Sequence, residues 1–173
     1  REINSILIDI SQQLFPFYEQ LKLNDDLIGE LDLIQAKAKL ANSMNAIKPH
    51  LNDEKVIDLK NARHPLLASD SVANDIQLGR DHISLIITGP NTGGKTVLIK
   101  TLGLELLMAQ TGIFITAGSD SSIYVFNNIF ADIGDEQSLE QSLSTFSSHM
   151  ENIKNILQQA DRNSLVLLDE LGA

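Results

Sequence analysis

Cysteine is absent from the 173 residues of this chain, and basic residues are scarce. Without cysteine the chain can form no disulfide and can offer no thiolate to a metal ion. No apolar run approaches the roughly 18 residues that a membrane-spanning helix needs, and no signal peptide is visible. These absences predict a cytoplasmic protein that has no membrane partner.

The shortage of basic charge bears on the choice of partner. The chain holds 13 Lys and Arg against 23 Asp and Glu, a formal net charge of −10. The net charge is −3 over residues 1–60 (7 basic, 10 acidic) and −7 over residues 61–173 (6 basic, 13 acidic). Because this mean field opposes a polyanion, we expect any nucleic-acid surface of the protein to lie outside these residues. The chain starts without Met and stops directly after a motif, so we expect a segment of a longer protein.

Residues 1–50 show helical periodicity. Apolar side chains recur at helical spacing from the start of the chain: Ile3, Ile6, Leu7, Ile10 and Leu14. Pro16 is expected to end or bend this first helix, and residues 24–26, Asn-Asp-Asp, to begin a second one that Pro49 ends. The short connection is typical of an αα-hairpin or a kinked rod. Packing as a small bundle is the favoured interpretation, and a lever connected to distant regions is the alternative.

The most informative stretch is a glycine-rich phosphate loop. Residues 89–96, Gly-Pro-Asn-Thr-Gly-Gly-Lys-Thr, match the pattern G-x-x-x-x-G-K-[ST]. Glycine lets backbone N–H groups turn toward a phosphate, and the helix that follows points its positive dipole end at the same place. Lys95 is predicted to bridge the β- and γ-phosphates of ATP, and the Thr96 hydroxyl to hold Mg²⁺. The predicted nucleotide-binding residues are Gly89, Pro90, Asn91, Thr92, Gly93, Gly94, Lys95, Thr96 and Val97.

The flanks of the loop predict an α/β domain. Residues 83–88 read as a strand entering the loop, and residues 95–108 as a helix for which Gly112 is the C-cap. Further short strands are predicted at residues 56–59, 72–78, 113–115, 122–125 and 128–130. With a boundary between residues 49 and 60, we expect a helical segment over residues 1–50. Residues 51–173 are then a P-loop ATPase domain that is incomplete at its C-terminus.

Two polar segments follow. The acidic residues 132–141 are predicted to form a solvated loop, with Gln137 or Gln141 facing the nucleotide as the less favoured alternative. Serines then precede a helix that runs to about residue 160, and they suit either N-capping or an anion site. His64, next to Pro65, is interpreted as structural rather than functional.

The last strand ends in an acidic pair. Residues 165–168, Leu-Val-Leu-Leu, are typical of a strand buried on both faces of a parallel sheet. Asp169 and Glu170 stand at its carboxyl end, where such sheets place their ligands. Asp169 is predicted to bind Mg²⁺ with Thr96, and Glu170 to act as the general base, with Lys95 as the other catalytic residue.

Taken together, these motifs resemble the MutS family of ATPases. The resemblance lies in the phosphate loop, in Ser-Thr-Phe-Ser-Ser-His-Met at residues 144–150, in Leu-Val-Leu-Leu-Asp-Glu-Leu-Gly-Ala at 165–173 and in Ala-Arg-His-Pro at 62–65. Residues 130–137, Phe-Ala-Asp-Ile-Gly-Asp-Glu-Gln, are more similar to the second bacterial branch of the family than to the mismatch-repair branch. The resemblance to the MutS family covers residues 61–173 closely. It covers residues 1–60 more loosely, as the end of a helical lever.

The resemblance implies an ABC-type ATPase, truncated here, that works as a homodimer with ATP and Mg²⁺. Ser144 and Thr145 would contact the γ-phosphate bound by the opposite subunit, and Asn91 would lie near the phosphates. Residues 72–74 would lie against the adenine, although Ser71 and Val72 replace the bulky aromatic often met there.

The second branch is associated with branched nucleic acids, control of recombination and stalled ribosomes, and usually carries an Smr nuclease domain. Those partners would bind through regions outside this chain. The alternatives are a nucleotide-binding module without turnover and a mismatch-repair-type ATPase. A transporter or chromosome-organising ABC ATPase is disfavoured, because residues 143–147 read Leu-Ser-Thr-Phe-Ser instead of Leu-Ser-Gly-Gly-Gln.

Overall fold

The computed structural model describes residues 2–67, 71–90, 93–134 and 142–169, without the side chains of residues 142–146 and 148. The chain divides into two compact units, Arg1–Leu40 and Ala41–Ala173. The architecture is mixed α/β, as predicted. No helix in the described ranges is both long enough and apolar enough to cross a membrane.

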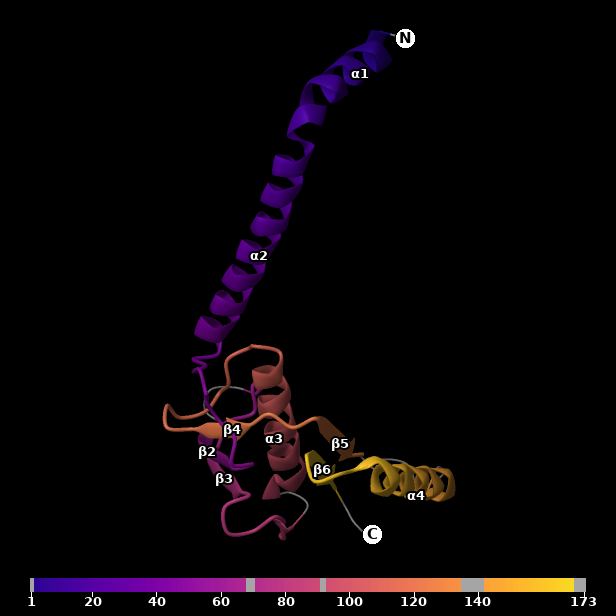
Figure 1. The fold of residues 1–173 in the computed structure, drawn as a ribbon. Coiled ribbons are helices and arrows are strands. Elements are labelled where there is room, and N and C mark those ends of the chain that lie inside the picture. Colours follow the sequence, from indigo (N-terminus) through magenta and orange to yellow (C-terminus); the bar gives the residue numbers. More distant parts are fainter. Residues whose placement is uncertain (1, 68–70, 91–92, 135–141, 170–173) are drawn as a thin grey trace. The chain divides into compact units, whose positions relative to one another are not determined.

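The first unit is helical along its described length. Helix α1 (Glu2–Leu14) passes through a 3₁₀ turn, η1 (Phe15–Phe17), into helix α2 (Tyr18–Ser43). The chain bends at η1, where Pro16 lies at the start of the turn (Figure 1). The bend predicted at Pro16 is therefore confirmed. The break predicted at residues 24–26 is wrong, because these residues lie inside α2.

The preference for a small bundle is also wrong for these two helices. A hairpin requires a reversal of direction, and the continuous helical run from Glu2 to Ser43 provides no loop for one. The apolar stripe is correspondingly exposed: no residue of α1 is buried, and Ala41 is the buried residue of α2. Among the described residues, α1 and α2 therefore form the kinked rod that the sequence left as an alternative.

The described residues of the second unit form two small sheets, two whole helices and the last residues of α2. Strands β1 (His50–Asn52), β2 (Ile57–Ala62), β3 (Asn74–Leu78) and β4 (Ser122–Tyr124) form a mixed sheet in the order β1-β4-β2-β3. β1 and β4 are parallel, and β2 is antiparallel to both β3 and β4. Strands β5 (Asn128–Asp132) and β6 (Ser164–Leu168) form a parallel pair. Helices α3 (Lys95–Gln110) and α4 (Ser142–Gln159) complete the unit (Figure 1).

Helix α3 supplies the centre of the core. Leu102 and Leu106 of α3 belong to one buried cluster with side chains of both sheets and with Ile115. The strand residues of this cluster are Ile57, Leu59, Ala62, Ile76, Ile123, Leu165 and Leu167. Packing on α3 is close, because a Cβ added to Gly103 would lie 2.8 Å from Cδ1 of Leu167. The helix that begins at the phosphate loop is therefore held by both sheets.

The predicted end of this helix is confirmed at Gly112, which has a φ of 71°. The Gly112 N–H donates to the Ala109 carbonyl and the Ile113 N–H to the Met108 carbonyl, the pattern of a Schellman cap. Glycine is suited to this position because a left-handed backbone carries no Cβ penalty there.

Three strand predictions differ from the structure. Residues 83–88 form no strand, and Ile83 and Ile86 are 94% and 84% exposed. A strand needs a neighbour for its backbone groups, and none of β1–β6 pairs with this segment. Residues 113–115 contribute only a bridge between Ile115 and Ile47. The last strand is buried on one face rather than both, since Val166 is 37% exposed between two buried leucines.

Candidate functional site

The phosphate loop leads directly into α3. Gly94 is the N-cap of the helix, and the first helical hydrogen bond runs from the Leu98 N–H to its carbonyl at 2.9 Å. The amide groups ahead of Leu98 thus belong to the open end of the helix, where the dipole favours an anion. Within the loop, the Gly93 N–H donates to the Pro90 carbonyl at 2.9 Å. The Lys95 ammonium donates to the Gly89 carbonyl at 2.6 Å.

Two glycines give the loop its shape through their backbone conformation. Gly89 has a φ of 149° and Gly94 a φ of 79°, both in the range that favours glycine. A Cβ at either position would meet no atom within 4 Å. The requirement for glycine is therefore conformational and not a matter of space in this structure.

Thr96 and Asp169 meet at the start of α3. The Thr96 hydroxyl donates to Oδ2 of Asp169 at 2.5 Å, across 73 residues of sequence. Asp169 directly follows β6, and its N–H donates to the Asp132 carbonyl at 2.9 Å, which continues the parallel pairing of β5 with β6. A hydroxyl and a carboxylate oxygen at one point are the ligand types that Mg²⁺ prefers. The pair therefore fits a magnesium ion that would take its other ligands from phosphate and water.

No group of three or more His, Asp or Glu side chains that suits a metal ion occurs in the described part of the chain. The Thr96–Asp169 pair therefore offers two protein ligands and not an all-protein cage.

A pocket of about 460 Å³ opens next to the loop. This volume lies in the range of about 300–1,000 Å³ that is usual for small-ligand sites. Its wall combines loop residues with the segment predicted to lie against a base, and the lining includes Ser71, Val72, Asn74, Gly89, Gly93, Gly94, Lys95 and Val97. The Ser71 hydroxyl is buried and has no hydrogen-bond partner among the described residues. The structure thus brings both ends of the predicted nucleotide site into one cavity.

Several predicted site residues cannot be placed. Asn91, Thr92, Gln137, Gln141 and Glu170 lie outside the described residues. Ser144 and Thr145 lie in the first turns of α4, but their side chains are not described. Their roles stay predictions.

His64 lines both this pocket and a second one. Its Nδ1 accepts a hydrogen bond from the Leu66 N–H at 3.2 Å, a local turn contact. Burial first, and the charge of Lys100 second, lower the pKa of His64 below its usual 6.5. A neutral ring that accepts at Nδ1 carries its proton on Nε2.

Sequence reasoning missed an anchor between α4 and β5. The Asp132 carboxylate is buried. Its Oδ2 lies 2.9 Å from Nδ1 of His149, and its Oδ1 accepts a hydrogen bond from the Asn152 side chain at 2.8 Å. Asp132 was assigned to a solvated loop, but it is the last residue of β5. The spacing of His149 and Asn152, three residues apart on one helix face, was the available signal.

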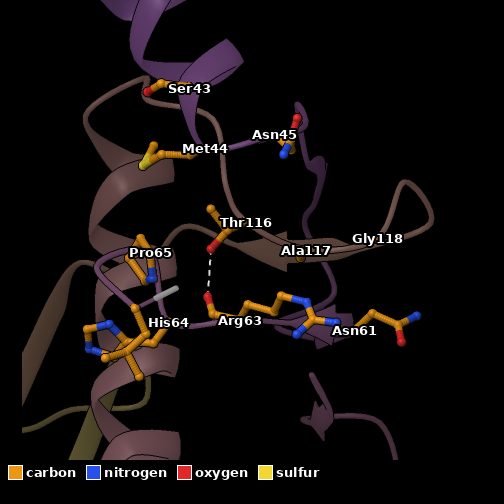
Figure 2. A pocket seen from close by; sticks show the side chains of 11 residues that line it. Ser43, Met44, Asn45, Asn61, Arg63, His64, Pro65, Thr116, Ala117 and Gly118 are labelled. Atoms are coloured by element: carbon orange, nitrogen blue, oxygen red, sulfur yellow. Dashed lines mark hydrogen bonds between the residues drawn. The ribbon is translucent and has the colours of Figure 1, made fainter. Parts of the chain in front are cut away.

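A second missed group surrounds Thr116. Glu105 of α3 is fully buried and accepts from the Thr116 N–H at 2.9 Å, and its other oxygen contacts the Thr116 hydroxyl. The Thr116 hydroxyl also lies 2.6 Å from the Arg63 carbonyl. Figure 2 marks this hydrogen bond with a dashed line. Thr116 and Arg63 line the second pocket, of about 330 Å³, together with Asn45, Asn61 and His64. A single Glu inside an apolar helix pattern was the only signal in the sequence.

Comparisons with known proteins all indicate the same family. Residues 85–173 match the family described as MutS domain V. The chain is 56% identical to a protein named Endonuclease MutS2 from Latilactobacillus sakei and 55% identical to one of that name from Listeria monocytogenes. It is 57% identical to the Putative endonuclease MutS2 of Bacillus subtilis. Each alignment covers 100% of this chain and 22% of the relative, so the chain spans about a fifth of the length of these relatives.

Proposed function

The chain belongs to the MutS family, and from this premise we propose that it binds and hydrolyses ATP as part of a dimeric, ABC-type ATPase. In the whole protein, the nucleotide state would control the grip on a branched nucleic acid or a stalled ribosome. The lever of residues 1–50 would connect the ATPase to those contacts, which lie on other regions. The protein would act in the cytoplasm. We also propose an endonuclease activity for the whole protein, because its relatives are named endonucleases.

One observation carries the ATPase proposal: the Thr96 hydroxyl and the Asp169 carboxylate meet at 2.5 Å beside the open end of α3. A phosphate group at that helix end would face backbone N–H groups, the helix dipole and the Lys95 ammonium. The Lys95 contact with the Gly89 carbonyl would be exchanged for contacts with phosphate oxygens.

Magnesium fits the same place. Thr96 and Asp169 would hold the ion, which when bound neutralises charge on the β- and γ-phosphates. Asp169 would keep the Thr96 side chain in position, and the backbone bond from Asp169 to Asp132 would fix the carboxylate at the end of β6. Glu170, the next residue, would accept a proton from the attacking water. Ser144 and Thr145 would act on the nucleotide of the partner subunit.

The base would occupy the other end of the pocket, near Ser71 and Val72. The Ser71 hydroxyl is a buried group without a described partner, so a base edge or a ribose hydroxyl would satisfy it. Since no bulky aromatic occupies this part of the sequence, base stacking would contribute less to affinity than the phosphate contacts do.

Calorimetry with Mg·ATP and a phosphate-release assay on the 173-residue chain test the proposal. We expect binding in the wild type and its loss in Lys95→Ala, while Glu170→Gln binds ATP without turnover. Lys100→Ala is the matched control, because Lys100 also lies on α3 but does not line the pocket. Binding without phosphate release in the wild type would favour the alternative of a nucleotide-binding module. Equal affinity in the wild type and Lys95→Ala would contradict the site itself.

A further inference from the structure

We propose that Glu105 is a positioning residue of the nucleotide pocket. As a neutral carboxylic acid it donates a hydrogen bond to the Thr116 hydroxyl. That hydroxyl can then donate its own proton to the Arg63 carbonyl and so position the part of the pocket lining that includes His64. The effect on nucleotide rests on the proposed function. The protonation of Glu105 does not, because it follows from contacts within the chain.

A count of protons supports the neutral acid. The Thr116 hydroxyl has one proton but lies within hydrogen-bond distance of two oxygens, the Arg63 carbonyl at 2.6 Å and Oε1 of Glu105. A carbonyl can only accept. If the carboxyl group were charged, it too could only accept, and one of the two oxygen pairs would lack a proton. Protonated Glu105 supplies the second proton, so that both contacts become hydrogen bonds.

The second carboxyl oxygen is consistent with this assignment. Oε2 accepts from the Thr116 N–H at 2.9 Å, so the proton of the acid belongs on Oε1. The side chain is fully buried, which makes a charge on it costly. Burial, the largest cause, raises the pKa of Glu105 above 4.5, whereas the two hydrogen bonds from Thr116 oppose the rise.

No charged neighbour in the described part of the chain offsets this burial. Helix α3 and the parts of the chain that share its core carry these charged or titratable side chains: Lys95 and Lys100 on α3, Lys48 before β1, Asp58 and Lys60 on β2, Arg63 and His64 after β2, Asp75 on β3, Asp120 before β4, Tyr124 on β4, Asp132 on β5 and Asp169 after β6. None of them contributes to the pKa shift of Glu105. In the described structure the carboxyl group thus has polar contacts with Thr116 and no counter-ion.

These contacts link α3 to the wall of the pocket. Thr116 and Arg63 are joined twice, since the Arg63 N–H also donates to the Thr116 carbonyl at 2.9 Å. Figure 2 shows the side-chain bond, with His64 directly after Arg63 in the chain. His64 and Leu67 line both pockets. Because Glu105 lies on the helix that begins at the phosphate loop, its contacts with Thr116 connect that helix to the segment that carries His64.

The Glu105→Gln variant distinguishes a protonated Glu105 from a charged one. Its amide can donate to the Thr116 hydroxyl and accept from the Thr116 N–H, as the protonated acid does. The variant cannot lose a proton. Glu105→Leu keeps the bulk but removes both contacts, and Thr116→Ser keeps the hydroxyl that Thr116→Val removes.

The first measurement is the urea midpoint of unfolding between pH 4 and pH 9. A folded-state pKa above 4.5 means that the stabilisation is complete below that pH and is lost as the pH rises through the folded pKa. We therefore expect wild type and Glu105→Gln to match at low pH, and the wild type to fall below the variant as the pH rises. A variant that is less stable than the wild type by the same margin at every pH would show a charged carboxylate and overturn the proposal.

The second measurement is the dissociation constant for Mg·ATP. We expect Glu105→Gln and Thr116→Ser to keep wild-type affinity at pH 6, and Glu105→Leu and Thr116→Val to weaken it about tenfold. The ratio of wild-type to Glu105→Gln affinity should follow the same pH dependence as the midpoints. Unchanged affinity in folded Glu105→Leu would refute the positioning role. If neither the wild type nor any variant binds nucleotide, the proposed function fails. The urea series still decides whether the Glu105 carboxyl group is protonated.

Discussion

Asp132 and His149 connect the end of β5 to α4, with Oδ2 of Asp132 lying 2.9 Å from Nδ1 of His149. The same carboxylate accepts from Asn152, and the Asp132 backbone carbonyl accepts from the Asp169 N–H. A single buried residue thus contacts both the helix predicted to carry the signature serines and the strand end predicted to bind magnesium. Its removal is expected to affect stability and nucleotide affinity together.

The Asp132→Ala variant tests this link. The change leaves the side chains of His149 and Asn152 without their acceptor, which should lower the free energy of unfolding by about 1–3 kcal/mol. Urea denaturation measures it. Asp9→Ala is the control, since Asp9 is exposed, accepts from Gln13 and should change stability by less than about 0.5 kcal/mol. Equal effects of the two changes would count against a structural role of the anchor.

The Thr96–Asp169 pair predicts a dependence on magnesium. Thr96→Ala and Asp169→Asn should weaken ATP binding about tenfold or more in the presence of Mg²⁺, because each removes an oxygen ligand. In EDTA their affinities should approach that of the wild type. Thr96→Ser, which keeps the hydroxyl, should behave like the wild type in both conditions. Titration calorimetry with and without the metal measures this, and a loss of the same size in EDTA would exclude a metal role.

Two exposed glycines should respond oppositely to alanine. Gly94→Ala forces a Cβ into a left-handed backbone with a φ of 79°, which should cost about 1 kcal/mol and weaken ATP binding. Gly29→Ala lies within α2 with nothing within 4 Å of the added Cβ, so it should stabilise that helix by about 1 kcal/mol. Thermal unfolding followed by circular dichroism measures both. If Gly94→Ala changed neither stability nor ATP binding, the left-handed backbone assigned to Gly94 would be wrong.

His64 should titrate below its ordinary range. Because burial lowers its folded pKa beneath 6.5, the stabilisation it gives is present above 6.5 and is lost as the pH falls through the folded value. An NMR titration of the imidazole protons should therefore place its midpoint below 6.5. Lys100→Met should move that midpoint upward, since the ammonium is the second cause of the shift. A midpoint at or above 6.5 in the folded chain would be incompatible with a desolvated ring.

The sequence predicted local features well where a short pattern has a local cause. The phosphate loop entered α3 at Gly94, and Gly112 capped the helix, because both depend on backbone conformation within a few residues. Asp169 could be located at a strand end because β6 is short and apolar. The contact of Asp169 with Thr96 depends on the pairing of β5 with β6, which no local pattern specifies.

Other features could not be predicted because distant partners decide them. Residues 83–88 have high β propensity, but they form no strand where no neighbour pairs with them. The Asn-Asp-Asp sequence at residues 24–26 resembles an N-cap, but an uninterrupted helix satisfies its backbone equally well. Glu105 and Asp132 are buried, and their hydrogen-bond partners Thr116, His149 and Asn152 lie elsewhere in the sequence.

The in-register pairing of β5 with β6 limits where the length of the chain can change. Asp132 lies opposite Leu168, and the bond between Asp169 and Asp132 extends this ladder by one step. A residue added outside the two strands, between β5 and β6, would leave this register unchanged. One residue added inside β6 would turn Asp169 to the opposite face of the strand and away from Thr96. Variants of this protein that differ in length should therefore differ outside β5 and β6 and keep the spacing from Ser164 to Asp169.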